Sequence, residues 1–76
     1  MKKQGRLENQ LHVLRAEKRW SQKDVAEMLN VSRQTILSIE ANRYNPSLIL
    51  AFEIADLFGK DIGEVFRYVK DEQEGE

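Results

Sequence analysis

The sequence contains no cysteine, only one histidine, His12, and only one proline. Without cysteine there is no disulfide framework, no thiolate nucleophile and no thiolate zinc site, so packing alone must stabilise the fold. A lone histidine without a paired metal-ligand motif does not make a metal site. A glycine-rich phosphate-binding loop is also missing. We therefore expect no metal, no cofactor and no small-molecule ligand.

Long apolar runs are missing as well. The most apolar stretch, Leu48 to Phe58, is too short to cross a bilayer, and the segment MKKQGRLENQ lacks the apolar core of a signal peptide. A chain of 76 residues has room for one domain. We expect that domain over residues 1–70, a disordered acidic tail over residues 71–76, and a cytoplasmic location with no membrane partner.

The charge is unevenly distributed along the chain. The formal net charge of −1 argues against a polyanionic partner, but residues 1–45 hold nine Lys and Arg against five Asp and Glu, whereas residues 46–76 hold three against eight. Phosphate binding depends on a local basic surface rather than on the whole-chain charge. The basic half leaves nucleic acid open as a partner, although a solvated charged surface explains the same pattern.

Helical periodicity and helix caps organise the first half of the chain. Leu7, Leu11 and Leu14 recur at i, i+4 and i+7 and predict a first helix that ends at about Lys18. Ser21 begins a capping box for a second helix over residues 21–29.

A tight turn then leads into a third helix. Asn30 tolerates the left-handed backbone conformation of such a turn, and Ser32 is a suitable cap for a helix that reaches about Ala41.

The second half predicts two more helices. Ser47 caps a fourth helix that is apolar on most sides, is expected to be the central buried element, and ends at Gly59. Asp61 and Glu64 offer a capping box for a short fifth helix through Phe66, after which residues 67–69 fray or extend. Helix caps and solvent explain the carboxylates here, so we expect no enzyme. The expected fold is all-α, with five helices.

The second and third helices have helix-turn-helix spacing, in which the later helix enters the DNA major groove. Ile36 and Ile39 point one way on the third helix, and the opposite face carries no acid. An arginine pairs with guanine, a glutamine with adenine, and an apolar side chain packs on a thymine methyl. The candidate base-reading residues are Arg33, Gln34, Leu37 and Ser38. On an arbitrary helix the same side chains are simply solvent-facing.

These residues carry a family resemblance. The string SQKDVAEMLNVSRQTILSIEANRYNPS from Ser21 to Ser47, preceded by Leu14-Arg15 and followed by DIGEVF from Asp61, resembles the Cro and lambda-repressor-like (XRE-type) helix-turn-helix family over residues 7–66. The resemblance implies a compact, five-helix, lambda-repressor-like DNA-binding domain.

The resemblance also implies roles for single residues. Gln22 matches a phosphate-contacting glutamine, and the other residues expected on the DNA backbone are Ser32, Thr35, Asn42, Arg43 and Tyr44. Arg15 and Glu40 match a structural ion pair, with phosphate contact as the alternative for Arg15. The sequence departs from the family at Trp20, where leucine is usual, at Asn30, where glycine is commonest, and at Ala41-Asn42, where Asn-Gly is frequent. Because Asn42 accepts a left-handed conformation, the loop geometry is expected to persist.

One small recognition helix reads few base pairs, so we expect a homodimer on a palindromic operator. The expected interface is the surplus apolar surface formed by Leu57, Phe58, Ile62, Val65, Phe66 and Tyr68. Completion of the monomer's own core is the alternative role for these six residues.

The function expected from the sequence is a sequence-specific, double-stranded-DNA-binding transcriptional regulator that acts as a repressor. The alternative is an antitoxin-like or other protein-interaction module that uses the acidic C-terminal half as its contact surface.

Overall fold

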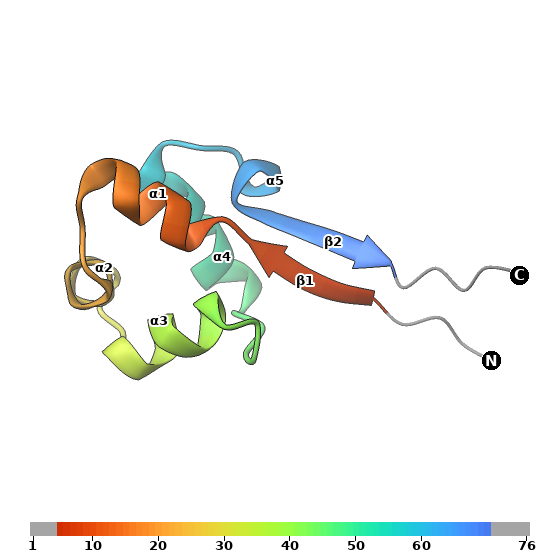
Figure 1. Ribbon diagram of the computed structural model, residues 1–76, viewed down its shortest axis with the longest axis horizontal. Coiled ribbons are helices and arrows are strands. Elements are labelled where there is room, and N and C mark those ends of the chain that lie inside the picture. Colours follow the sequence, from red (N-terminus) through yellow and green to blue (C-terminus); the bar gives the residue numbers. More distant parts are fainter. Residues whose placement is uncertain (1–4, 71–76) are drawn as a thin grey trace, which may run out of the picture.

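The computed structural model describes residues 5–70, which form a helical body and a two-stranded ribbon (Figure 1). In chain order the elements are β1 (Gly5–Asn9), α1 (Leu11–Lys18), α2 (Gln22–Leu29), α3 (Arg33–Glu40), α4 (Leu48–Phe58), α5 (Ile62–Val65) and β2 (Phe66–Lys70). The ribbon projects from one side of the body. The acidic tail expected over residues 71–76 lies outside the described residues.

Three serines begin helices as the sequence predicts. The Oγ atoms of Ser21, Ser32 and Ser47 accept hydrogen bonds from backbone N–H groups in the first turns of α2, α3 and α4, at 2.9, 3.1 and 3.1 Å. The backbone N–H of Ser21 donates in return to Asp24 Oδ2 at 2.8 Å, which completes a capping box. Each cap satisfies an N–H group that the helix itself leaves unpaired.

The predicted left-handed turn residues are also present. Asn30 ends α2 with φ = 60°, Asn42 follows α3 with φ = 60°, and Gly59 ends α4 with φ = 66°. Arg19 ends α1 in the same conformation, with φ = 61°. These turns reverse the chain sharply, so the short helices pack against each other.

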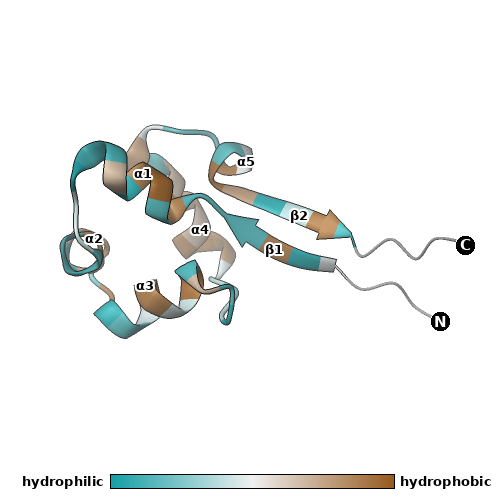
Figure 2. Cartoon of the chain, in the orientation of Figure 1, coloured by the Kyte–Doolittle hydropathy of each residue, from teal (hydrophilic) through white to brown (hydrophobic). Residues whose placement is uncertain are grey.

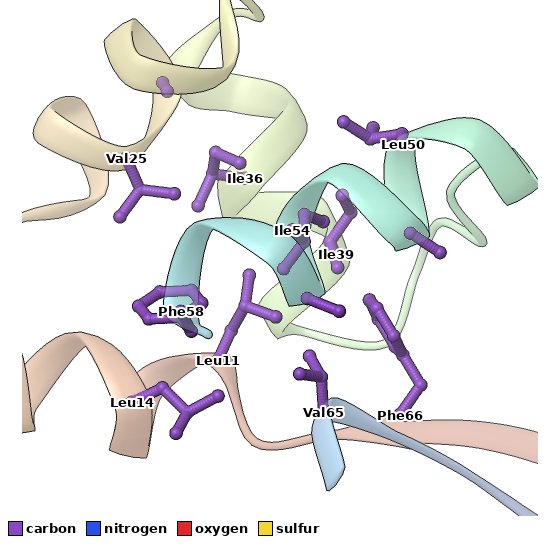
Figure 3. Packing of buried hydrophobic residues seen from close by; sticks show 13 residues of the cluster. Leu11, Leu14, Val25, Ile36, Ile39, Leu50, Ile54, Phe58, Val65 and Phe66 are labelled. Atoms are coloured by element: carbon purple, nitrogen blue, oxygen red, sulfur yellow. The ribbon is translucent and has the colours of Figure 1, made fainter. Parts of the chain in front are cut away.

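All five helices contribute to one apolar core (Figure 3). The largest fully buried side chains are Leu11, Val25, Ile36, Ile39, Ile54 and Val65. Ile36 and Ile39 fix the inner face of α3, so burial determines which face of this helix remains outside.

The expectation of an all-α fold is wrong, because β1 and β2 pair as an antiparallel ribbon with Leu7 opposite Tyr68. Leu7 stands four residues before Leu11 and imitates helical periodicity, yet α1 begins only at Leu11. Strand pairing between the two ends of the described chain satisfies the backbone groups of residue 7. The extended segment considered for residues 67–69 forms, and Phe66 belongs to β2 rather than to the fifth helix.

Gly5 leaves room for the ring of Tyr68 in this ribbon. A Cβ atom at position 5 would lie 2.1 Å from Cζ of Tyr68, so the tyrosine ring occupies the space that any other side chain would fill. An aromatic ring over a strand glycine covers backbone that the missing side chain leaves open.

The apolar residues expected to form a dimer interface divide between core and surface. Phe58, Val65 and Phe66 are 5%, 1% and 8% exposed and belong to the monomer's core, which corrects their assignment to a surface. Leu57 and Ile62 pack partly buried against that core, and Tyr68 is 61% exposed. α4 is likewise buried on one face only, since its first turns expose Leu48, Ile49 and Phe52.

None of the helices within residues 5–70 combines the length and apolar character that crossing a membrane requires.

Candidate nucleic-acid interface

The helix α3 lies at the edge of the body, with α2 packed beside it across the turn at Asn30 (Figure 1). Its inner face enters the core through Ile36 and Ile39. The first residues of α3 are hydrophilic, as Figure 2 shows, and Arg33 and Gln34 are exposed. Because its inner face is buried, α3 can contact a binding partner only through its outer face.

The four candidate base-reading residues share that outer stripe. Arg33 and Gln34 are exposed, and Leu37 and Ser38 are half-buried. Gln34 Nε2 donates to Ser38 Oγ at 3.3 Å, one helical turn further on. This bond joins the amide and the hydroxyl into one polar surface with both hydrogen-bond donors and acceptors.

The loop after α3 continues the same surface. A shallow hollow is lined by Gln34, Thr35 and Ser38 of α3 together with Arg43 and Tyr44 of the loop. Arg43 and Tyr44 are both exposed. The structure thus brings residues expected on bases and residues expected on the DNA backbone around one depression.

Thr35 and one further residue expected on the DNA backbone, Ser32, lie at the beginning of α3. The Oγ of Ser32 lies 2.9 Å from Oγ1 of Thr35, and Ser32 caps the helix. The N-terminus of a helix favours an anion because its first N–H groups point outward.

Arg15 and Glu40 form a two-bonded ion pair between α1 and α3. Arg15 Nε donates to Glu40 Oε2 at 2.6 Å and Arg15 Nη2 to Glu40 Oε1 at 3.0 Å. Arg15 Nη1 donates to the backbone oxygen of Trp20 at 3.0 Å. The two side chains are only 19% and 10% exposed. The guanidinium therefore uses all three of its nitrogen atoms inside the protein, which leaves little for a phosphate.

Electrostatics stabilise both charges of this pair. Burial by itself raises the pKa of Glu40, but hydrogen bonds from Arg15 and Gln22, together with the positive charges of Arg15 and His12, hold the pKa below its ordinary value. The hydrogen bond to Glu40 raises the pKa of Arg15 against the effect of burial. Both groups stay ionised, and the carboxylate closest to the candidate DNA face is neutralised by its partner.

Gln22 joins this pair from α2, a contact that the sequence analysis does not anticipate. Its Nε2 donates to Glu40 Oε1 at 3.1 Å. One N–H of the amide remains for a phosphate, because an amide nitrogen carries two hydrogens. The bond makes Glu40 a common acceptor for side chains of α1 and α2, and so fixes the angle of α3.

Asn9 is a second residue that the sequence analysis misses. Its Nδ2 donates to the backbone oxygen of Ile39 and to Oδ1 of Asn42, both at 2.9 Å, and its Oδ1 accepts from the N–H of Leu11 at 3.0 Å. No local pattern predicts this role, because the two partners of the amide nitrogen lie thirty residues away or more. The hydrogen bonds of Asn9 connect the end of β1 to the end of α3.

The residues that the structure describes contain no candidate metal site. Within residues 5–70, no group of three or more His, Asp or Glu side chains is placed to hold a metal ion.

The sequence of this chain is similar to those of known proteins. The sequence profile of the helix-turn-helix family matches residues 11–65. An uncharacterized HTH-type transcriptional regulator of Methanocaldococcus jannaschii is 48% identical over 66 residues, which cover 87% of this chain and all of the relative. The uncharacterized HTH-type transcriptional regulator YgzD of Bacillus subtilis is 38% identical over 60 residues, with 79% and 91% coverage.

Solved structures share the fold. A crystal structure of a Bacteroides fragilis protein proposed to bind DNA superposes with a TM-score of 0.72 at 28% identity, covering 80% of this chain and 98% of that one. The transcriptional regulator VanUg superposes with a TM-score of 0.73 over 88% and 89% of the two chains, and at 20% identity it supports the fold alone.

Proposed function

This chain belongs to the helix-turn-helix family, and from that premise we propose that it regulates transcription by binding a palindromic operator in double-stranded DNA as a homodimer. In this proposal α3 lies in the major groove of each half-site. The relatives described as HTH-type transcriptional regulators support the same class of function.

The observation that carries the proposal is the outer face of α3. Ile36 and Ile39 anchor the helix from inside, and the opposite stripe offers donors and acceptors without a carboxylate. A major groove admits one α-helix and displays a different pattern of donors and acceptors for each base pair. We assign base reading to Arg33, Gln34, Leu37 and Ser38 on this basis.

The residues around that stripe are assigned to the DNA backbone. Ser32 and Thr35 stand at the helix N-terminus, and Arg43 and Tyr44 border the hollow beside α3. Asn42 belongs to the same loop as Arg43 and Tyr44. Gln22 has one amide N–H that its bond to Glu40 does not use. Contacts of this kind position a protein on DNA without reading its sequence.

Repression is the simpler outcome of such binding. A dimer that occupies an operator blocks other proteins from that stretch of DNA, and this needs no further contact surface. Activation would require a specific contact with the transcription machinery. We therefore propose a repressor.

The test begins with the selection of binding sites from random duplexes of about 25 base pairs, which is long enough for two half-sites one helical turn apart. Fluorescence anisotropy then compares the selected site with single-base variants. The selected sites should be palindromic, and Gln34→Ala should lose discrimination at one position per half-site by about 1–3 kcal/mol.

Gln10→Ala is the matched control, since Gln10 is an exposed glutamine outside α3, beside α5 and the ribbon. This variant should bind as the unmodified protein does. Recovery of no preferred sequence, with equal and weak binding to all duplexes, would contradict the proposal and would favour a role in protein interaction.

A further inference from the structure

The first turns of α4 expose three large apolar side chains that the core does not use. Leu48 is 70% exposed, Ile49 72% and Phe52 53%. At about 100° per residue these positions fall within one third of the helix circumference, away from the buried face. That buried face is formed by Leu50, Ala51, Ile54, Ala55 and Phe58. We call Leu48, Ile49 and Phe52 the α4 patch.

The beginning of α4, which carries the patch, lies on the side of the body from which the ribbon projects (Figure 1). α3 ends at Glu40, the loop follows, and α4 begins at Leu48. Residues of that loop and of the ribbon meet there, since Asn42 and Asn45 line a hollow together with Leu7 and Tyr68. Tyr68, 61% exposed, borders this hollow from the ribbon.

We propose that a second copy of this chain covers the α4 patch, around a two-fold axis that passes beside Ile49 and Phe52. The inference rests on the proposed function for the choice of occupant. It replaces the interface expected from the sequence, because three of those six residues are buried in the monomer. Tyr68 is retained from that set.

An axis on this side of the molecule is compatible with operator geometry. Recognition helices in two successive half-sites lie about 34 Å apart, so the axis lies about 17 Å from the centre of each α3. Eight residues make α3 about 12 Å long, and its end therefore lies about 6 Å from its centre. If the axis lies beyond the end at Glu40, the remaining distance of about 11 Å accommodates the loop and half of a helix-to-helix packing distance of about 8–10 Å.

The size and chemistry of the surface fit an isologous contact. A two-fold interface places the same patch on both partners, so like charges at its centre would repel. The α4 patch is uncharged, and the acids of the same helix, Glu53 and Asp56, follow it on the C-terminal side. Together with Tyr68 these side chains offer apolar surface on the order of 500 Å², the larger part of the roughly 800 Å² per partner of a standard interface.

Because the chain contains no cysteine, a single introduced thiol reports directly on this geometry. Ile49→Cys should form a covalent dimer under a mild added oxidant, since a residue beside a two-fold axis meets its own copy. Val13→Cys on α1 and Met28→Cys on α2 are exposed apolar controls at 39% and 45% exposure, and both should remain monomeric on denaturing gels.

Sedimentation velocity without DNA gives the second measurement. Phe52→Glu should convert the dimer to a monomer with an unchanged far-ultraviolet circular dichroism spectrum, whereas Met28→Glu should remain dimeric. On DNA, Phe52→Glu should lose at least tenfold in affinity for the palindrome and keep the affinity of the unmodified protein for an isolated half-site.

The proposal is overturned if Phe52→Glu sediments as a dimer, or if Ile49→Cys crosslinks no better than the two controls. It is also overturned if the unmodified protein is monomeric both free and on palindromic DNA. A dimer that dissociates in Phe52→Glu but never binds DNA would sustain this interface while contradicting the proposed function, so the two failures are distinguishable.

Discussion

The charges of Arg15 and Glu40 are partly buried at a cost that their mutual contact and their hydrogen bonds to Trp20 and Gln22 offset. Removal of the two charged groups from water carries a desolvation penalty, and the paired hydrogen bonds between them at 2.6 and 3.0 Å help to offset this penalty. When one partner is lost, the other remains partly buried without its counter-charge. The pair should therefore matter far more to stability than the ion pairs on the surface.

We expect Glu40→Gln to lower the free energy of unfolding by about 3 kcal/mol, because it leaves the guanidinium of Arg15 without its counter-charge. Glu8→Gln is the control, since Glu8 pairs with Arg6 and Arg67 at 3.1 and 3.9 Å on an exposed face. Glu8→Gln should lower the free energy of unfolding by less than about 1 kcal/mol. Urea unfolding followed by Trp20 fluorescence measures both, and equal losses would show that the pair does not hold α3.

The same variant tests the pH dependence of stability. The pKa of Glu40 is lowered from its ordinary value of 4.5, so the pair contributes fully above that pH and loses its contribution as the pH falls through the lower folded-state value. Between about pH 6 and about pH 3 the unmodified protein should lose more stability than Glu40→Gln. Hydrogen bonds from Ser21 also lower the pKa of Asp24, but Asp24 is common to both proteins and cancels in the difference. Parallel acid limbs for the two proteins would contradict this assignment.

At the scale of elements, three helices end in the same left-handed backbone conformation, which a different residue type adopts in each. α1, α2 and α4 each end in a left-handed residue whose N–H returns to a carbonyl of the last turn. Gly59 adopts this conformation without a Cβ, Asn30 tolerates it, and Arg19 does so at the cost of a Cβ contact with the following backbone. The two turns without glycine should therefore gain different amounts of stability from a glycine substitution.

Arg19→Gly should raise the free energy of unfolding by about 0.5–1 kcal/mol, since relief of the left-handed strain exceeds the entropy that glycine adds to the unfolded chain. Asn30→Gly should gain less, because asparagine already tolerates this conformation. Thermal unfolding compares the two variants with the unmodified protein. A gain that is equal in both, or absent at Arg19, would show that strain at these ends is negligible.

The elements that local chemistry specifies are the ones the sequence predicts. Serine caps, a left-handed asparagine and a terminal glycine locate α2, α3 and α4, because each acts on neighbouring residues. The ribbon escapes prediction, since the pairing of Leu7 with Tyr68 joins distant segments and Leu7 also fits a helical repeat. The bonds of Asn9 and Gln22 within the candidate site are missed for the same reason. Burial of Phe58, Val65 and Phe66 depends on how the elements pack, which their apolar character alone does not settle.

At the scale of the whole molecule, the formal net charge of −1 conceals a separation of charge. Arg33 and Arg43 lie on or beside α3, and Glu40 is neutralised by Arg15. The loop at residues 59–61, between α4 and α5, lies on the opposite side of the body (Figure 1). Because screening removes interactions beyond about 8–10 Å at moderate salt, the charge that DNA meets is the local one.

The salt dependence of binding makes this separation measurable. Each phosphate that a cationic side chain neutralises releases condensed counterions, so the logarithm of the affinity falls with the logarithm of the salt concentration in proportion to the number of such contacts. Arg43→Gln should weaken binding by a similar factor on all DNA sequences and reduce this slope by about one for each protomer bound. Lys60→Gln removes the same charge from the opposite side of the body, and its slope should match that of the unmodified protein. If the two variants shifted the slope equally, the net charge of the chain rather than the surface around α3 would govern its affinity for DNA.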